Sequence, residues 1–237
     1  QRNQQSAMQW KNWRIDYMYL SRIALNTNRK DTMTALASPQ KLHAAVESSF
    51  PPSDEKANRN IWRIDRLNNN LYLLVLSDKK PDFLHIVEQF GWPGAEQKWE
   101  TKDYTILLER IKEGQTWQFR LRANPIHHVI ANGETQTQEK KQRGKIYAHV
   151  TEDQQSKWLL DRGERYGFML NVDSFRVVQR DIKRFKHRNG FITLGIATYE
   201  GVLEVTDVTL FRNALINGIG RAKAYGCGLM TIGKVST

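Results

Sequence analysis

The order of strand and helix patterns is the feature that most restricts how this chain can fold. In the first half, the patterns follow one another as strand, helix, strand, strand and helix, at 18–25, 38–50, 60–65, 71–76 and 81–90. Ser38-Pro39 opens the first helix, since serine caps free amides and proline suits the first helical position. Residues 104–111 fit either a fourth strand or a short helix.

A similar order restarts after Gly114. Its strand, helix, strand, strand, helix and final strand are expected at 117–123, 151–160, 174–185, 191–205, 208–216 and 229–232. The two long strands are joined by Lys186–Gly190, which ends in Asn-Gly, the strongest short-range signal of a hairpin. A strand-helix-strand-strand-helix-strand order is that of a ferredoxin-like unit. The chain is therefore predicted to be α+β, with two tandem ferredoxin-like (RRM-like) βαββαβ domains.

The expected boundaries divide the chain into three parts. Residues 18–113 form the first ferredoxin-like domain, and residues 114–237 form the second. Residues 1–17 show no clear period and stand before Met18 as an N-terminal extension that need not be native. Within the second domain, the polar, lysine-rich stretch 132–146 is predicted to be a mobile loop.

Charge and cysteine content bound the partners and the compartment. The chain has 36 Lys and Arg against 25 Asp and Glu, a formal net charge of +11, which favours phosphate-rich partners. No apolar run approaches the roughly 20 residues of a membrane span, and the polar start lacks the apolar core of a signal peptide. Cys227 is the single cysteine, which excludes an internal disulfide and a cysteine-based metal cluster. A reducing, cytoplasmic location is the simplest interpretation.

Two basic elements are candidates for binding nucleic acid. The expected hairpin carries six cations, opposed mainly by Asp181: Arg176, Arg180, Lys183, Arg184, Lys186 and Arg188. A long ribbon can enter a nucleic-acid groove, where each neutralised phosphate adds salt dependence to binding, although charge runs are usually solvated faces. Arg120 and Arg122 share one face of the strand 117–123 and could pair with phosphates in bidentate fashion. The alternative is an edge strand kept soluble by charge.

The stretch Gly218 to Gly228 places four glycines and two cations, Arg221 and Lys223, just before the last strand. Consecutive amides in such a loop, including those of Gly218 and Gly220, can form a concavity for an anion. The alternative is a tight helix-to-strand turn with solvated cations. The spacing fits neither a Walker A loop nor a dinucleotide-binding fingerprint, so no nucleotide cofactor is expected.

His43 is the candidate proton carrier. It follows Leu42 on the first helix and therefore lies about 100° round from the apolar stripe, at its border. An imidazole can give or take a proton near neutral pH, and a border position lets it face a cleft. His127 and His128 are adjacent and hence poor joint ligands, and His85 is expected to be packed. No spacing typical of a metal site appears.

Taken together, these residues resemble one family, the CasE endoribonucleases of the RAMP superfamily, which process CRISPR repeats in type I-E Cascade complexes. The resemblance spans Met18 to about Ile232 and leaves out residues 1–17. The matching motifs are Met18-Tyr-Leu-Ser-Arg22, Pro39-x-x-Leu42-His43, Trp62-Arg-Ile64, Phe119–Pro125, Tyr199-Glu-Gly-x-Leu203 and Gly218–Leu229. The Phe-Arg-Leu-Arg-Ala-Asn-Pro segment and the terminal glycine motif, in this order, are highly specific.

The resemblance implies metal-independent cleavage of precursor CRISPR RNA at the base of a repeat hairpin. The 2′-hydroxyl next to the scissile phosphate would attack, leaving a 5′-hydroxyl and a cyclic phosphate, and such a nucleophile would discriminate against DNA. His43 stands at the family's histidine and would act as general base or acid. The enzyme would retain the mature guide RNA, and its partners would be the repeat RNA and the other Cascade subunits.

One position departs from the family. Relatives carry tyrosine three residues before the histidine, where this chain has Gln40. An amide can position an oxygen but cannot exchange a proton as a phenol can. The sequence offers Lys41, Lys56 or Arg59 to supply charge to the transition state instead.

Two other functions stay open at this stage. The same fold can bind RNA without cutting it, which would make the chain a non-cleaving, structure-specific RNA-binding subunit of a ribonucleoprotein. A generic single-stranded RNA binder of the RRM kind would show a Lys/Arg-Gly-Phe/Tyr-x-Phe strand motif, which the sequence lacks.

Overall fold

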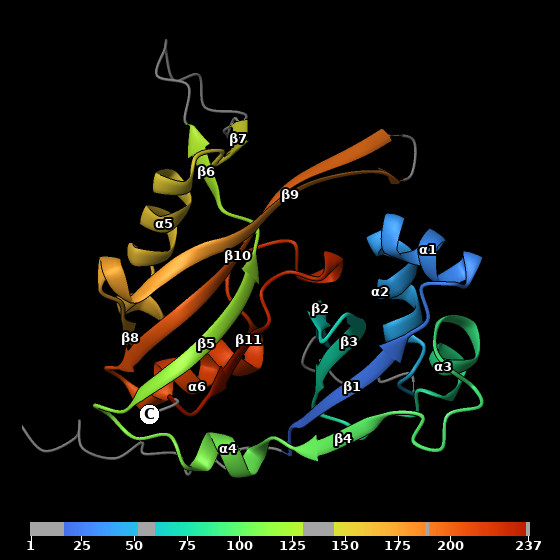
Figure 1. The fold of residues 1–237 in the computed structure, drawn as a ribbon. Helices are drawn as coiled ribbons and strands as arrows, with labels where there is room; N and C mark the ends of the chain where they lie inside the picture. The colour runs from blue at the N-terminus through green and yellow to red at the C-terminus, as the bar shows by residue number, and fades with distance from the viewer. Residues whose placement is uncertain (1–16, 52–59, 130–144, 188–189, 236–237) are drawn as a thin grey trace, which may run out of the picture.

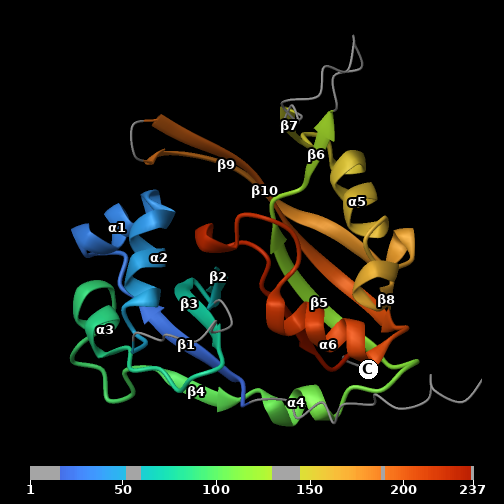
Figure 2. The same cartoon turned by 180° about the vertical axis from the view of Figure 1, so that it is seen from behind.

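The computed structural model describes residues 17–51, 60–129, 145–187 and 190–235. Two antiparallel sheets with their helices stand side by side, and a long two-stranded ribbon reaches from one sheet toward the helices of the other (Figures 1 and 2). The expected α+β class, with ferredoxin-like strand order in both sheets, is confirmed.

The first sheet takes the order β2-β3-β1-β4, with every neighbouring pair antiparallel. Its strands are β1 (Tyr19–Leu25), β2 (Ile61–Leu67), β3 (Asn70–Ser77) and β4 (Glu100–Asp103). Its helices are α1 (Lys30–Ala37), α2 (Pro39–Glu47) and α3 (Leu84–Phe90). The sequence-based prediction lacks α1, because this helix buries only Thr32 and Ala35 and so shows no apolar stripe.

The segment 104–111, for which strand and helix stayed open, contains the short helix α4 (Thr105–Glu109). The fourth strand of the first sheet, β4, comes just before it and pairs with β1. The four residues of β4 are polar, so the sequence shows no apolar pattern for this strand. It forms because it pairs with β1.

The second sheet takes the order β11-β5-β10-β8, with β9 paired to β10. Its strands are β5 (Thr116–Ala123), β8 (Phe168–Met169), β9 (Phe175–His187), β10 (Gly190–Val205) and β11 (Met230–Gly233). The helices are α5 (Glu152–Leu160) and α6 (Val208–Asn217), with the 3₁₀ turns η1 (Glu164–Tyr166), η2 (Val172–Ser174) and η3 (Lys223–Tyr225). Thr151 and Gln154 form a capping box at the start of α5, where this helix was predicted to begin.

A small third sheet corrects the predicted loop 132–146. β6 (Ile126–Val129) pairs with β7 (Lys145–Ala148), so residues 145 and 146 belong to a strand. Main-chain pairing with β6 outweighs the polar, lysine-rich composition from which the loop was inferred. Residues 130–144 lie outside the described part of the chain.

The ribbon is the long hairpin predicted from the Asn-Gly signal. β9 and β10 pair from Phe175 opposite Gly201 to His187 opposite Gly190, and a register shift leaves Val178 as a bulge. In both views the ribbon crosses the molecule and ends near α1 and α2 (Figures 1 and 2). The turn residues 188 and 189 lie outside the described residues.

The contact between the two sheets is part of the main core. Ile61 and Leu76 of the first sheet are buried in the same cluster as Leu121 and Met230 of the second. Trp62 belongs to a separate cluster beneath the helices of the first sheet. Neighbouring residues of a strand point to opposite faces, so β2 contributes side chains to both cores.

Candidate functional site

His43 lies on the face of α2 that borders the core, as predicted. Leu42 and Val46 are buried and anchor the helix, while 29% of the His43 side chain stays exposed. The Nδ1 atom of His43 lies 3.7 Å from Glu47 Oε1 and is buried without a hydrogen bond. Glu47 Oε2 accepts a bond from Asn60 Nδ2 at 3.4 Å. Glu47 thus places a carboxylate beside the imidazole, one helical turn away on α2.

Gln40 joins α2 to the tip of the ribbon. Its Oε1 atom lies 3.2 Å from Nδ1 of His187, the last residue of β9. Nδ1 is the donor, because an amide oxygen can only accept. Gln40 and His43 are three residues apart on one helix, so their side chains are neighbours. The predicted catalytic helix and the predicted RNA-binding ribbon therefore meet, although they come from opposite halves of the chain.

The glycine-rich stretch completes this meeting point. Its turn η3 packs against α2 and β2. The ring centroid of Tyr225, in η3, lies 5.0 Å from that of Phe185 and 6.4 Å from that of His187. Because Phe185 is buried, these ring contacts hold the tip of the ribbon over the start of α2. We name the group of Gln40, His43, His187 and Tyr225 the tip site.

The glycines of this stretch serve close packing. Four of them have positive φ: Gly218, Gly220, Gly226 and Gly228. A Cβ at Gly226 would lie 2.6 Å from the ring of Trp62, and one at Gly220 would lie 3.2 Å from the ring of Trp158. The loop therefore packs between Trp62 of the first sheet and Trp158 of α5. This close packing explains why glycine is needed here.

The amides and cations of the loop have different environments. Gly218 is buried and its N–H donates to the Ala214 carbonyl at 2.9 Å, so this amide already has an acceptor within the protein. Arg221 is exposed, and Lys223 is half-buried in η3. The cations, more than the Gly218 amide, are accessible to an anion.

The cations of the ribbon fall on two faces, because side chains alternate along a strand. Beyond the bulge, three share one exposed face: Arg180, Arg184 and Lys186. Arg184 also lies over the ring of Phe191, 4.7 Å from its centroid. Lys183 is half-buried on the opposite face, with Phe185 and His187. Arg176 is exposed before the bulge, and Arg188 lies outside the described residues.

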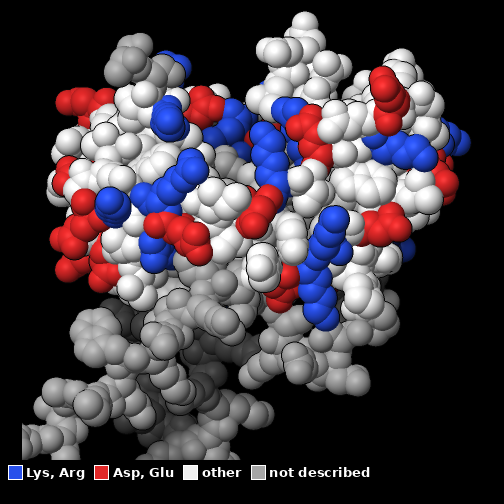
Figure 3. Space-filling model, turned by 90° about the horizontal axis from the view of Figure 1, so that it is seen from below, with Lys and Arg blue, Asp and Glu red and all other residues white. Residues whose placement is uncertain are grey.

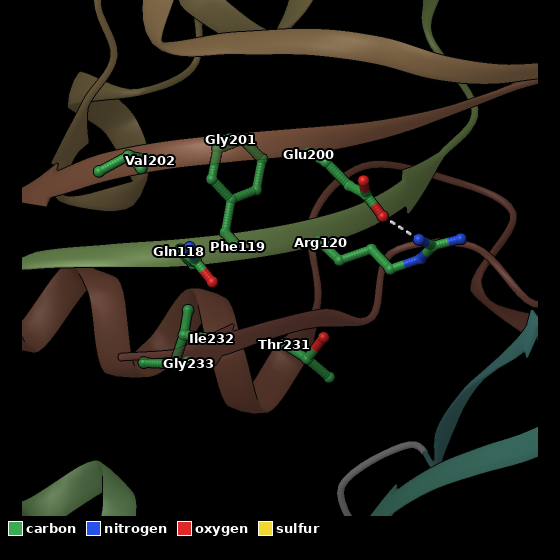
Figure 4. A pocket seen from close by; sticks show the side chains of 9 residues that line it. All are labelled: Gln118, Phe119, Arg120, Glu200, Gly201, Val202, Thr231, Ile232 and Gly233. Atoms are coloured by element: carbon green, nitrogen blue, oxygen red, sulfur yellow. Dashed lines mark hydrogen bonds and ion pairs between the residues drawn. The ribbon is translucent and has the colours of Figure 1, made fainter. Parts of the chain in front are cut away.

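Arg120 and Arg122 lie on the open face of the second sheet, where carboxylates meet them. Arg120 pairs with Glu200 of β10, and its Nε atom lies 3.2 Å from Asp65 Oδ1 of β2. Arg122 Nη2 lies 3.5 Å from Asp181 Oδ2. Figure 4 shows Arg120 extended toward Glu200 beside a shallow hollow between β5, β10 and β11. Both arginines are thus partly neutralised within the protein.

Arg63 ties this region to the first sheet. Its side chain is 1% exposed and makes two hydrogen bonds to Asp65, at 2.8 and 2.7 Å. Its Nη1 atom also donates to the carbonyls of Arg120 and Leu229 in the second sheet. Burial lowers the pKa of Arg63, and the Asp65 carboxylate opposes that shift. Arg63 and Asp65 therefore form a buried ion pair that bridges the two sheets.

The remaining candidates offer little chemistry. Cys227 is free and buried, and burial raises the pKa of its thiol to about 12, so the nucleophilic thiolate is scarce at neutral pH. Within residues 17–51, 60–129, 145–187 and 190–235, no group of three or more His, Cys, Asp or Glu side chains could hold a metal ion. His85 is packed as expected, with Nε2 3.0 Å from the Ala45 carbonyl.

The other predicted catalytic residues are only partly placed. Lys41 is exposed on α2, one residue beyond Gln40. Arg59, together with Lys56, lies outside the described residues. Sequence analysis missed His187 and Tyr225 as site residues, because nothing local in the hairpin or the glycine stretch indicates which helix they meet.

Three comparisons with known proteins bear on this site. The family model described as CRISPR associated protein matches residues 18–234. The CRISPR-associated endoribonuclease Cse3 of Thermus thermophilus is 28% identical over 229 residues, covering 91% of this chain and 99% of that protein. The Cascade subunit CasE of Escherichia coli is 22% identical over 193 residues, covering 81% and 90%. A structure of Thermus thermophilus Cse3, bound to an RNA representing a pre-cleavage complex, superposes with a TM-score of 0.73 at 25% identity, covering 92% of this chain and 99% of that one.

Helices long and apolar enough to cross a membrane are not found among the described residues.

Proposed function

Since this chain belongs to the CRISPR-associated protein family, we propose that it is an endoribonuclease that processes precursor CRISPR RNA within Cascade. It binds the repeat stem-loop, cleaves it without a metal ion, and retains the mature guide RNA. The resemblance to the CasE family noted from the sequence motifs is confirmed by the family model and the two relatives. The relatives' names, an endoribonuclease and a Cascade subunit, support this activity and these partners.

One observation carries the proposal: the tip site joins the histidine helix to the RNA-binding ribbon. His43 and Gln40 lie side by side on α2, and Gln40 bonds His187 at the end of β9. A stem-loop that lies along the ribbon therefore reaches α2, the helix that carries the predicted proton carrier, His43. Binding and cutting then occur at one place, although their residues are far apart in sequence.

The exposed face of the ribbon is the proposed contact with the RNA stem. Arg180, Arg184 and Lys186 share it, and each can neutralise one phosphate. Arg221 and Lys223 of the glycine-rich stretch extend the basic surface toward α2. Arg120 and Arg122 would join it where RNA phosphates displace their carboxylate partners. The underside of the molecule, in contrast, intersperses acidic and basic side chains (Figure 3).

The proposed cleavage is an attack by the ribose 2′-hydroxyl on the adjacent phosphorus. His43 takes the proton from O2′ while the O2′–P bond forms and the P–O5′ bond breaks. O5′ gains a proton as it leaves, so the products are a cyclic phosphate and a 5′-hydroxyl. Glu47, 3.7 Å from His43 Nδ1, stabilises the resulting imidazolium and leaves Nε2 as the proton acceptor. A general base placed in this way contributes about 10²–10⁴-fold in rate. Lys41, exposed on α2, is proposed to supply positive charge to the phosphate.

The experiment is cleavage of a repeat stem-loop RNA in excess EDTA by the wild-type protein, the His43→Gln variant and the His127→Gln variant. The wild type and His127→Gln should cleave at equal rates, since His127 lies on β6. His43→Gln should lose about 10²–10⁴-fold while its affinity for the RNA stays near that of the wild type. Dependence on a divalent metal, or full activity without His43, would overturn the mechanism.

The second candidate function is a non-cleaving RNA-binding subunit. Gln40 favours it, because an amide replaces the phenol that relatives carry and cannot transfer a proton. Tight binding of the stem-loop with no product after long incubation, for the wild type, would decide for this alternative.

A further inference from the structure

We infer that His187, at the tip of the ribbon, is the second proton carrier of the tip site and protonates the leaving 5′ oxygen. This inference rests on the proposed ribonuclease activity. Gln40 stands where relatives carry a tyrosine, and it cannot transfer a proton. The inference therefore assigns the group that makes the second proton transfer.

The reaction needs two proton transfers. O2′ gives up its proton as the O2′–P bond forms, and O5′ must gain one as the P–O5′ bond breaks, because an alkoxide is a poor leaving group. A single imidazole on α2 serves one of these transfers at a time. Gln40 serves neither, since its amide neither gains nor loses a proton at neutral pH.

His187 contacts the helix that carries His43. Its Nδ1–H donates to Gln40 Oε1 at 3.2 Å, and Gln40 and His43 lie three residues apart, with Cβ atoms roughly 5–6 Å from one another. The two imidazoles therefore flank one amide. With Nδ1 of His187 bound to Gln40 and Nδ1 of His43 facing Glu47, both rings have Nε2 left for the substrate.

The ring of His187 is held in position from two sides. Tyr225 presents its ring edge-on at 6.4 Å between centroids, at an interplanar angle of 81°. Phe185, two residues earlier on the same face, is buried against Tyr225. The imidazole is thus fixed by Gln40 and by an aromatic contact, which is the support that a group needs to act in a defined geometry.

The step balances with the groups present. His43 Nε2 accepts the proton from O2′, the electron pair of O2′ forms the bond to phosphorus, and the P–O5′ pair leaves with O5′. The protonated His187 gives its Nε2 proton to O5′. The two histidines return to their starting states by exchanging protons with water, and no oxidant, reductant or metal is consumed.

The test uses two stem-loop RNAs, one natural and one with sulfur in place of the 5′ oxygen at the scissile bond. A thiol has a pKa of about 8.5, so the sulfur leaves as a thiolate without being protonated. On the natural RNA, His187→Gln should lose about 10²–10⁴-fold in single-turnover rate. On the sulfur RNA it should cleave at nearly the wild-type rate. The glutamine amide can still donate a hydrogen bond to Gln40 Oε1.

Two further variants test whether the selective loss is specific to His187. His43→Gln should be slow on both RNAs, because the base is needed whatever the leaving group. His127→Gln, on β6 and outside the tip site, should stay close to the wild type on both. Equal losses on the two RNAs for His187→Gln, or no loss on the natural one, would overturn the role of His187 alone. A wild type that cleaves neither RNA would overturn the proposed function itself.

Discussion

Two regions of this molecule use arginine in opposite ways. In the contact between the sheets, Arg63 and Arg120 pair with carboxylates, and Arg63 is fully buried. Arg122, on the same strand as Arg120, pairs with Asp181 of β9. On the ribbon, Arg180 and Arg184 share an exposed face with Lys186, and the described residues of β9 and β10 place no acidic side chain beside them there. The first set is neutralised within the protein, whereas the second is exposed to solvent.

The comparison shows what a strand pattern can and cannot tell. Both strands, β5 and β9, carry several basic residues, and both were predicted to bind phosphate. The carboxylates that meet Arg120 come from other strands, Asp65 from β2 and Glu200 from β10. Only the fold decides whether a basic face meets a carboxylate or solvent. Stability should therefore depend mainly on the first set, and RNA affinity mainly on the second.

The largest expected effect is on Arg63. Replacing it with methionine leaves Asp65 buried and paired only with Arg120, and removes the donors to the Arg120 and Leu229 carbonyls. Breaking one side of a buried ion pair costs about 3–5 kcal/mol. Urea unfolding should show this loss in the free energy of unfolding of Arg63→Met.

The matched control is Arg66→Met on the same strand. Arg66 is exposed and makes only a 3.4 Å bond to the Asn69 carbonyl, so its loss should change the free energy of unfolding by less than about 0.5 kcal/mol. Similar stabilities for the two variants would contradict the view that the paired arginines hold the sheets together.

The next largest effect concerns the loop that supports the tip site. Gly226 and Gly114 have nearly the same φ, 77° and 76°, but a Cβ at Gly226 would meet the Trp62 ring at 2.6 Å, and one at Gly114 would meet nothing within 4 Å. Alanine at Gly114 costs only backbone strain, about 1 kcal/mol. Alanine at Gly226 adds overpacking of about 1–3 kcal/mol. Thermal unfolding of the two variants measures the difference in stability. Equal losses of stability would contradict close packing of Gly226 against Trp62.

Much of the fold could be predicted from the sequence, because its signals are local. The Asn-Gly turn, the capped start of α5 and the apolar stripe of α2 each depend on neighbouring residues. The misses, α1 and β4, bury few apolar side chains and are held by the elements beside them. The segment 145–146 was misassigned for the same reason, since its strand depends on pairing with β6.

The site was predictable only in its parts. His43 and the basic ribbon were found separately, from a helix border and from charge. Their meeting through Gln40 and His187 joins residues 147 positions apart, and no local pattern encodes such a contact. The glycine stretch shows the same limit, since its closest neighbours, Trp62 and Trp158, come from other elements.

The ribbon provides the most direct test of the account. The measurement is the salt dependence of stem-loop RNA affinity for three proteins: the wild type, a ribbon variant with Arg180, Arg184 and Lys186 changed to Gln, and a control with Lys102, Arg110 and Lys112 changed to Gln. Both variants remove the same charge, and the control residues are exposed on and around β4 and α4. The slope of log affinity against log salt should fall by roughly 0.7–0.9 for each phosphate that the ribbon variant no longer neutralises and stay unchanged in the control. Equal slopes for the two variants would contradict the proposal that the ribbon's exposed cations, and not net charge, bind the RNA.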